Sequence, residues 1–206
     1  MRNVIIIIIM ETKRIEALAD GIFAIAMTLL ILEIHIPEIH NASTSELFQE
    51  LSRMIPQFAS FFISFLILGI SWIGHHNQFK FIKKSDRVFL WLNILYFMFI
   101  SVIPFSAGFL GHYTTNEASI IVYSLNLTLV GIVLFLHWNY AVSHKLTEGE
   151  ISAKFMTHVN IRILIGPVVY LLAIGVSFVN VYVSLFIFLI PALFQIFPGA
   201  VDEFLK

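Results

Sequence analysis

Three side chains that could do acid–base or metal chemistry interrupt long apolar stretches of this sequence. Asp20 lies in an apolar run that ends at Pro37, and His75 and His76 lie near the end of another. A carboxylate and two imidazoles can act as general acid and base or hold a metal ion. Adjacent side chains on a helix point about 100° apart, so one ion cannot easily bind both histidines. We therefore expect no catalytic site and no metal site here, and no cofactor.

A structural role fits these residues better. An acid in a membrane-length apolar run needs a partner or a cavity, and a buried charge is tolerated only when it is paired. Several polar and aromatic residues fall at helix ends on one side of the expected bundle. We expect them to form one buried hydrogen-bond network that fixes the first helix: Arg14, Asp20, Trp72, His75, His76 and Asn93.

The composition places the chain in a membrane. Hydrophobic residues make up 59% of the 206 residues and charged residues only 12%, and the mean hydropathy is +0.91. A soluble domain carries about 25% charged residues, so a bilayer must cover the apolar excess. A net charge of −1 offers no basic surface for nucleic acid. Because the chain has no cysteine, it has no disulfide, thiol nucleophile or cysteine-based zinc site.

Six stretches are long and apolar enough for a spanning helix of about 20 residues. Their approximate ranges are 18–36, 54–79, 88–110, 118–142, 159–178 and 181–197. We expect an all-α polytopic membrane protein, residues 1–206 forming a single domain of six transmembrane helices with one repeat per chain. The apolar run Val4–Met10 is short for a signal sequence and is interpreted as a tail before the first helix.

The basic residues orient this arrangement. With the N-terminus in the cytoplasm, Arg53 is the single one of the twelve Lys and Arg residues outside. Cytoplasmic loops of membrane proteins carry such an excess of Lys and Arg. We therefore expect a multi-pass protein of the cell membrane with both termini cytoplasmic.

The first apolar stretch presents a narrow face. At 100° per residue, the residues Gly21, Ile25, Thr28, Leu29 and Leu32 share one side of a helix. The face is apolar except for Thr28, and it extends about 10 Å from Ile25 to Leu32. Packing against another helix or against lipid explains such a face as well as a pore does, and the pattern alone leaves these alternatives open.

Residues 14–30 resemble the first-helix signature of the transmembrane protein 175 family, the lysosomal potassium channel and its prokaryotic homologues. That signature is Arg, three residues, then Phe-Ser-Asp. Arg14 and Asp20 keep this spacing, while Leu18 and Ala19 replace Phe and Ser. Residues 71–79 and 90–105 are similar to the end of the family's second helix and to its third helix.

This resemblance implies a homotetramer in which the first helix of each subunit lines a central pore. The hydrophobic constriction then falls on Ile25, Leu29 and Leu32, and Thr28 supplies a polar layer. The permeant ion is potassium. Because the sequence has no Thr-Val-Gly-Tyr-Gly filter, potassium selectivity would come from pore width, partial dehydration at the Ile25 ring and the Thr28 hydroxyl layer, and would be modest.

Other functions remain as alternatives. A proton-conducting channel would use the same pore, and a secondary cation transporter would show inverted repeats, which this sequence does not display. A membrane enzyme would need more acid, base and nucleophile residues around one cavity than Asp20, His75 and His76 provide. Glu33, near the outer end of the first helix, is either a cation-attracting residue of the pore mouth or an ordinary interfacial residue.

Overall fold

The computed structural model describes residues 12–37 and 43–196, and the regular structure of these residues is helical. The long helices are α1 (Thr12–Leu29), α3 (Ile55–Phe79), α4 (Arg87–His112), α5 (Glu117–Ser143) and α6 (Ala153–Ser177). The shorter ones are the 3-10 helix η1 (Leu30–Glu33), α2 (Thr44–Arg53), α7 (Val181–Ile187) and α8 (Leu189–Ile196). The run Val4–Met10, interpreted above as a tail, lies outside the described residues.

Among the described residues, five helices are long and apolar enough to cross a membrane, which confirms five of the six predicted spans of a multi-pass membrane protein. The observed bounds of α3, α4 and α5 agree with the predicted ones to within two residues. α6 begins earlier than predicted because Ser152 caps it, its side chain accepting a hydrogen bond from the backbone N–H of Phe155.

The sixth predicted span, 181–197, is shorter and interrupted. It folds as α7 and α8, which separate at Phe188, and residue 197 lies outside the described residues. Pro191 explains the break, because it has no N–H for the carbonyl of Ile187, the last residue of α7. The stretch 181–195 reaches about 22 Å at 1.5 Å per residue, less than the roughly 30 Å of a bilayer core.

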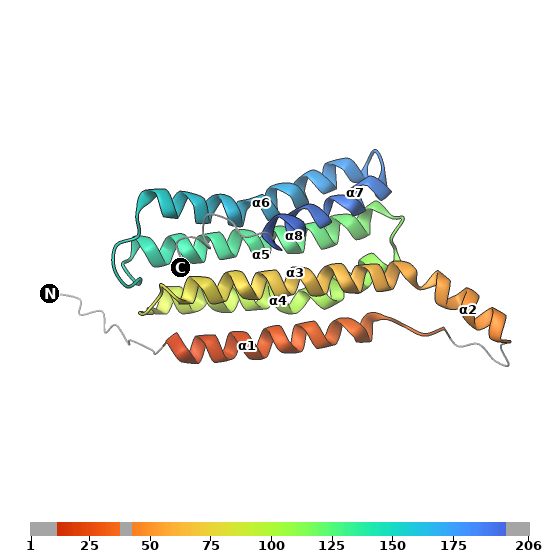
Figure 1. Ribbon diagram of the computed structural model, residues 1–206, viewed down its shortest axis with the longest axis horizontal. Coiled ribbons are helices and arrows are strands. Elements are labelled where there is room, and N and C mark those ends of the chain that lie inside the picture. Colours follow the sequence, from red (N-terminus) through yellow and green to blue (C-terminus); the bar gives the residue numbers. More distant parts are fainter. Residues whose placement is uncertain (1–11, 38–42, 197–206) are drawn as a thin grey trace.

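The long helices lie side by side with α1 on one edge of the bundle (Figure 1). α1 packs against α3 and α4, α4 packs against α5, and α5 packs against α6. Helices α7 and α8 return along α6, and α8 also contacts α3. In Figure 1, α8 ends near the middle of the bundle. The edge position of α1 leaves much of its surface uncovered in a single chain.

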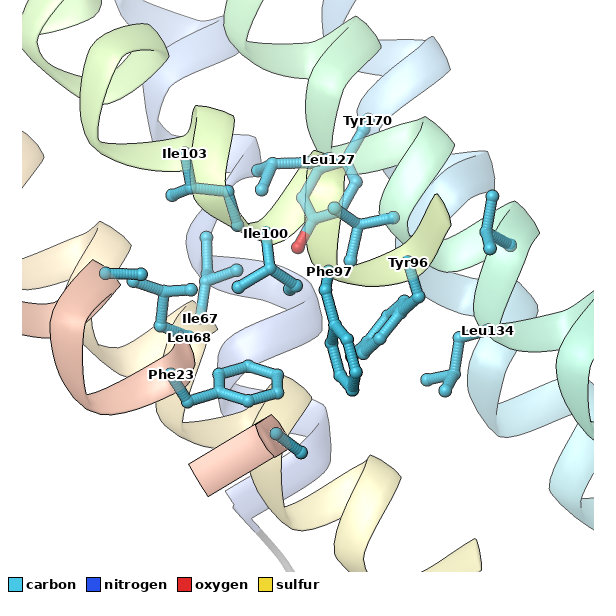
Figure 2. Packing of buried hydrophobic residues seen from close by; sticks show 14 of the residues in the cluster. Phe23, Ile67, Leu68, Tyr96, Phe97, Ile100, Ile103, Leu127, Leu134 and Tyr170 are labelled. Carbon is cyan, nitrogen blue, oxygen red and sulfur yellow. The ribbon is translucent and has the colours of Figure 1, made fainter. Parts of the chain in front are cut away.

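Aromatic and branched side chains fill the core between α1, α3, α4 and α5 (Figure 2). Phe23 of α1 points toward Leu68 of α3 and Ile100 of α4 in that view. At the other side of the bundle, α5 and α6 approach closely at a glycine. A Cβ at Gly131 would lie 2.4 Å from Cγ of Pro167, so the proline ring occupies the space of the missing side chain.

Most basic residues of the described chain gather at one end of the bundle, where α1, α4 and α6 begin and α3 and α5 end; we call this the basic end. They are Lys13, Arg14, Lys80, Lys83, Lys84, Arg87, Lys145 and Lys154. Two loops are joined there: the backbone N–H groups of Lys83 and Lys84 both donate to the carbonyl of Leu146. Arg53, at the opposite end, pairs with Glu50.

The helix α2 was not predicted from the sequence. It projects from the end of the bundle opposite the basic end (Figure 1). Ser43 and Glu46 form a capping box at its start: the side chain of Ser43 accepts from the Glu46 N–H, and the Glu46 carboxylate accepts from the Ser43 N–H. Its apolar residues Leu47, Phe48 and Leu51 are exposed.

Candidate functional site

The first helix has one buried face and one exposed face. Its buried residues follow helical spacing and pack on α3 and α4: Ile15, Ala19, Phe23, Ala26 and Leu30. The residues of the predicted pore face lie on the other side, where Ile25 is 60% exposed and Leu32 is 68% exposed. Gly21 and Thr28 are also exposed, and Leu29 is 42% exposed. In a single chain, no protein covers this face, although it has the apolar composition of an interior.

The outer end of α1 tightens into η1, which changes the geometry of the face. A 3-10 helix has three residues per turn, so residues three apart lie directly above one another. Leu29, at the junction, and Leu32 therefore align along the axis more closely than α-helical spacing predicts. At about 2.0 Å rise per residue in η1, the face from Ile25 to Leu32 extends about 12 Å.

Thr28 is the polar member of this face, and its hydroxyl is oriented by the helix. Its Oγ1 donates to the carbonyl of Ala24 at 3.0 Å and to that of Ile25 at 2.9 Å. A hydroxyl has one proton and two lone pairs, so the proton is used within the helix. The exposed side of the Thr28 oxygen is therefore an acceptor, which suits a cation and disfavours an anion.

Asp20 anchors α1 to α3 on the exposed side of the helix. Trp72 Nε1 donates to Asp20 Oδ1 at 2.8 Å. The Trp72 ring in turn stacks on His76, with centroids 5.6 Å apart and planes 21° apart. These three residues, predicted to form part of a network, are brought together, but all three are exposed in a single chain.

His75 and Asn93 form a separate, buried pair between α3 and α4. His75 is 2% exposed and Asn93 is 1% exposed, and His75 Nε2 lies 3.2 Å from Asn93 Oδ1. The His75 ring stacks on Tyr96 with planes 4° apart, and Phe23 of α1 packs against both rings. The buried part of the predicted network therefore touches α1 through an aromatic side chain, not through its acid.

The prediction of one buried network is corrected in two respects. The polar contacts fall into an exposed group and a buried group, because His75 and His76 point to different sides of α3. Arg14 belongs to neither group: it is exposed, and within the part of the chain that the structure describes no hydrogen bond or ion pair involves it.

A second buried histidine extends the buried group and was not predicted. His137 Nδ1 lies 2.8 Å from Gln78 Oε1, and the His137 and His75 rings are 5.7 Å apart. Gln78 follows His75 by three residues and so lies on the same face of α3. Nothing in the sequence links His137 of α5 to that face, since the pairing depends on how α5 packs against α3 and α4.

The outer end of α1 is held by contacts with α4. The Glu33 side chain lies over Gly108, where a Cβ would be only 2.2 Å from Glu33 Oε2. Two residues later, His35 Nδ1 lies 3.2 Å from His112 Nε2. Glu33 thus turns toward α4 and away from the exposed face that carries Ile25 and Leu32.

The described residues contain no group of three or more His, Cys, Asp and Glu side chains that could hold a metal ion. The exposed face of α1 is an apolar strip with one acceptor layer, on a helix fixed to its neighbours near both ends.

Comparison with known proteins gives consistent matches. A sequence profile described as "Endosomal/lysosomal potassium channel TMEM175" matches residues 14–104. A protein of Streptomyces collinus, named a potassium channel, is 31% identical over 180 residues, 85% of this chain and 86% of that protein. The crystal structure of a lysosomal potassium-selective channel TMEM175 homolog from Chamaesiphon minutus matches with a TM-score of 0.79 and 29% identity. That match covers 90% of this chain and 96% of the other.

A vertebrate relative carries a different name. A protein of Gallus gallus named "Endosomal/lysosomal proton channel TMEM175" is 32% identical over 146 residues. These residues are 66% of this chain but 29% of the Gallus gallus protein. The profile match spans α1, α3 and most of α4, the helices that form and hold the exposed face.

Proposed function

The chain belongs to the TMEM175 family, and from this premise we propose that it is a potassium channel whose pore is lined by its first helix. The family is one of channels and not of enzymes. The observation that carries the proposal is the uncovered apolar face of α1, interrupted by the single polar layer of Thr28. Lipid could cover an apolar strip, but it would leave the Thr28 acceptor without a partner.

Four copies of the chain would close this face around an axis. One helix per chain cannot enclose a pore, so the conducting form requires symmetry-related subunits, and we propose a homotetramer. Ile25, Leu29 and Leu32 would then form successive apolar rings, and four Thr28 oxygens would form a ring of acceptors between them. Apolar rings force an ion to shed part of its hydration shell, and they can close the pore by dewetting.

Selectivity would arise from these two elements together. Potassium loses hydration water at lower cost than sodium, so a narrow apolar ring favours potassium. The Thr28 ring offers lone pairs to the partly dehydrated cation, because the hydroxyl proton points back to the helix carbonyls. Without a ring of backbone carbonyls, we expect a modest preference for potassium over sodium.

The membrane placement follows from the charges. We propose that the protein lies in the cell membrane, as for its bacterial relatives, with the basic end in the cytoplasm. α7 and α8 begin at the outer end and return along α6, and we propose that this segment makes the sixth crossing, with the bilayer thinned locally to match its length of about 22 Å. Both termini would then be cytoplasmic.

The decisive experiment is planar-bilayer recording of the purified protein in a potassium/sodium gradient. We expect a reversal potential that favours potassium, and a larger conductance in Ile25→Asn because a polar side chain hydrates the narrow ring. Leu172→Asn is the matched control, since Leu172 of α6 is also well exposed but lies outside the proposed pore. Absence of current, or a conductance that is the same in Ile25→Asn as in the wild-type protein, would contradict the proposal.

Cysteine accessibility gives a second readout. Because the chain contains no cysteine, single cysteine substitutions can be made directly in the wild-type sequence. Ile25→Cys and Leu32→Cys should react with a water-soluble thiol reagent and lose current. Phe23→Cys, on the buried face of the same helix, should not.

Proton conduction is the second candidate, favoured by the name of the Gallus gallus relative. The same pore would serve, with water rather than a potassium ion bridging the apolar rings. Imposing a pH gradient at equal potassium concentrations separates the two candidates, because only proton permeation then shifts the reversal potential. A fixed ratio of coupled ions would instead indicate a secondary transporter.

A further inference from the structure

A small crevice lies at the outer end of the bundle, between η1, α3 and α4. It has a volume of about 10 Å³, room for about one water molecule or one ion of that size, and its polar lining comes from Glu33 of η1 and Gln57 of α3. Glu33, Gln57 and the α4 backbone behind them all belong to one chain. The crevice is therefore complete in one subunit and would exist whether or not the subunits form the proposed pore.

Two glycines of α4 make this approach possible. A Cβ at Gly108 would lie 2.2 Å from Glu33 Oε2 and 2.9 Å from its Cδ, so the carboxylate rests on bare backbone. A Cβ at Gly111 would lie 3.1 Å from the Cα of Gln57, so α3 also comes close to α4 at this level. The glycines thus bring a carboxylate and an amide side chain to the same crevice.

Both side chains present oxygen atoms that lack donors. Gln57 Oε1 is buried and has no hydrogen-bond partner. No hydrogen bond or ion pair among the described residues engages the Glu33 carboxylate. Arg53, the basic residue that α2 brings to this end, is paired with Glu50 and does not neutralise Glu33. Glu33 is only half-buried, but a buried acceptor such as Gln57 Oε1 needs a donor or a cation.

We propose that this crevice binds a monovalent metal cation, potassium or sodium, held by the Glu33 carboxylate and Gln57 Oε1. Hard cations prefer such oxygen ligands, and water on the solvent side of half-buried Glu33 would fill the remaining coordination positions. One carboxylate supplies one negative charge, which balances a monovalent ion. Binding would link η1 to α3 and so fix the outer end of the first helix.

The site differs in kind from the proposed pore. A pore ion passes between subunits along Ile25 and Thr28, whereas this ion would sit inside one subunit behind that face. Occupancy of this site would follow the cation concentration outside the cell, and the bound cation would act on the helix that carries the pore face. Its consequence for gating depends on the proposed function, but its existence does not.

Thallium(I), a heavy analogue of potassium, tests the site directly. Crystals of the full chain grown with thallium should show an anomalous peak between Glu33 and Gln57. The peak should be lost in Gln57→Leu, which keeps the bulk and removes the oxygen. Absence of the peak in the wild-type protein, or its persistence in Gln57→Leu, would overturn the proposal. A direct hydrogen bond between the Gln57 amide and Glu33, or a proton held on Glu33, predicts no peak.

A solution measurement provides an independent check. The thermal midpoint of the protein in detergent should rise when N-methylglucamine chloride is replaced by potassium chloride at equal ionic strength. Glu33→Gln should remove most of the rise, and Glu117→Gln, which changes an exposed carboxylate at the same end, should not. A rise retained in Glu33→Gln would contradict the site.

Ions bound in the proposed pore could also raise the midpoint, and Thr28→Val separates the two sources. A rise that survives in Thr28→Val but not in Glu33→Gln belongs to the crevice. A rise lost only in Thr28→Val belongs to the pore and overturns the crevice site. Protein that does not conduct should still show the thallium peak, so failure of the channel proposal is distinguishable from failure of this one.

Discussion

Trp72 donates its indole N–H to the Asp20 carboxylate at 2.8 Å and thereby joins α1 and α3. This bond lies beside the proposed pore face, and the Trp72 ring is backed by His76. Asp20 therefore fixes the position of α1 against α3. The buried aromatic residue Phe23 determines how deeply α1 packs into the bundle. The acid is a positioning group and does not need to touch a permeating ion.

Breaking this bond should weaken the attachment of α1. We expect Asp20→Ala and Trp72→Phe each to lower stability or tetramer yield, with a coupling of about 1 kcal/mol in a double-mutant cycle. Asp20→Asn should retain much of the wild-type behaviour, because its carboxamide oxygen still accepts. Arg14→Gln should show no coupling to Trp72, since Arg14 lies outside this group. Additive effects of the Asp20 and Trp72 substitutions would disprove the link.

Replacing Thr28 by valine should reduce potassium selectivity. Thr28→Val keeps the shape of the side chain and removes the ring of acceptors, so the potassium/sodium permeability ratio should fall toward one. Thr28→Ser should keep the ratio, because serine can make the same bond to a helix carbonyl.

Reversal potentials in mixed potassium and sodium solutions measure this ratio. The matched control is Thr157→Val, because the Thr157 hydroxyl of α6 makes an equivalent bond, to Ala153 at 2.9 Å, away from the pore face. An unchanged ratio in Thr28→Val would place selectivity elsewhere.

The contact between α5 and α6 should be sensitive to a single methyl group. Gly131→Ala would bring a Cβ to 2.4 Å from the rigid ring of Pro167, and we expect a loss of about 1–3 kcal/mol. Gly175→Ala is the control: nothing lies within 4 Å of its Cβ, so replacement should be neutral or stabilising by up to about 1 kcal/mol. Thermal unfolding in detergent compares the two. Equal melting curves would show that the helices can separate freely there.

The start of α2 should loosen in acid. Hydrogen bonds from the backbone N–H and the hydroxyl of Ser43 lower the pKa of Glu46 below its ordinary value of 4.5. A lowered pKa in the folded state means that the stabilisation is complete above pH 4.5 and is lost as the pH falls through the lowered pKa. Hydrogen exchange of the α2 amides, corrected for intrinsic rates, should show this loss.

Glu46→Gln should remove that pH dependence, whereas Glu50→Gln, on the same helix but outside the capping box, should keep it. Protection of α2 that stays constant from neutral to strongly acidic pH in the wild-type protein would contradict the role of the capping box.

The spanning helices could be predicted because their apolar length is a property of sequence alone. Two local features were not predicted. Pro191 divides the sixth apolar stretch, and the capping box at Ser43 starts a helix where a loop was expected. The two faces of α1 followed from helical periodicity, which makes the exposure of Ile25 and Leu32 a consequence of spacing.

Pairings across helices were harder to predict. A resemblance and a shared side of the membrane predicted that Asp20 and Trp72 belong to one network, but the bond between them was not predicted. The partner of His137 and the position of Glu33 over Gly108 depend on how helices pack, and neither leaves a mark in one sequence. That Arg14 acts together with Asp20 stays a prediction: both charges lie on the exposed side, and among the described residues only Asp20 has a partner.

The bond from Trp72 to Asp20 also sets an order of events during synthesis. Trp72 follows Asp20 by 52 residues. At roughly 5–20 residues per second, a ribosome needs about 3–10 s to add the missing donor. During that interval the Asp20 carboxylate has no indole N–H from which to accept a hydrogen bond. Neither α3 nor α4 yet covers the buried face of α1. The helix proposed to line the pore is thus made before α3 and α4, and it cannot pack in its final position until they follow.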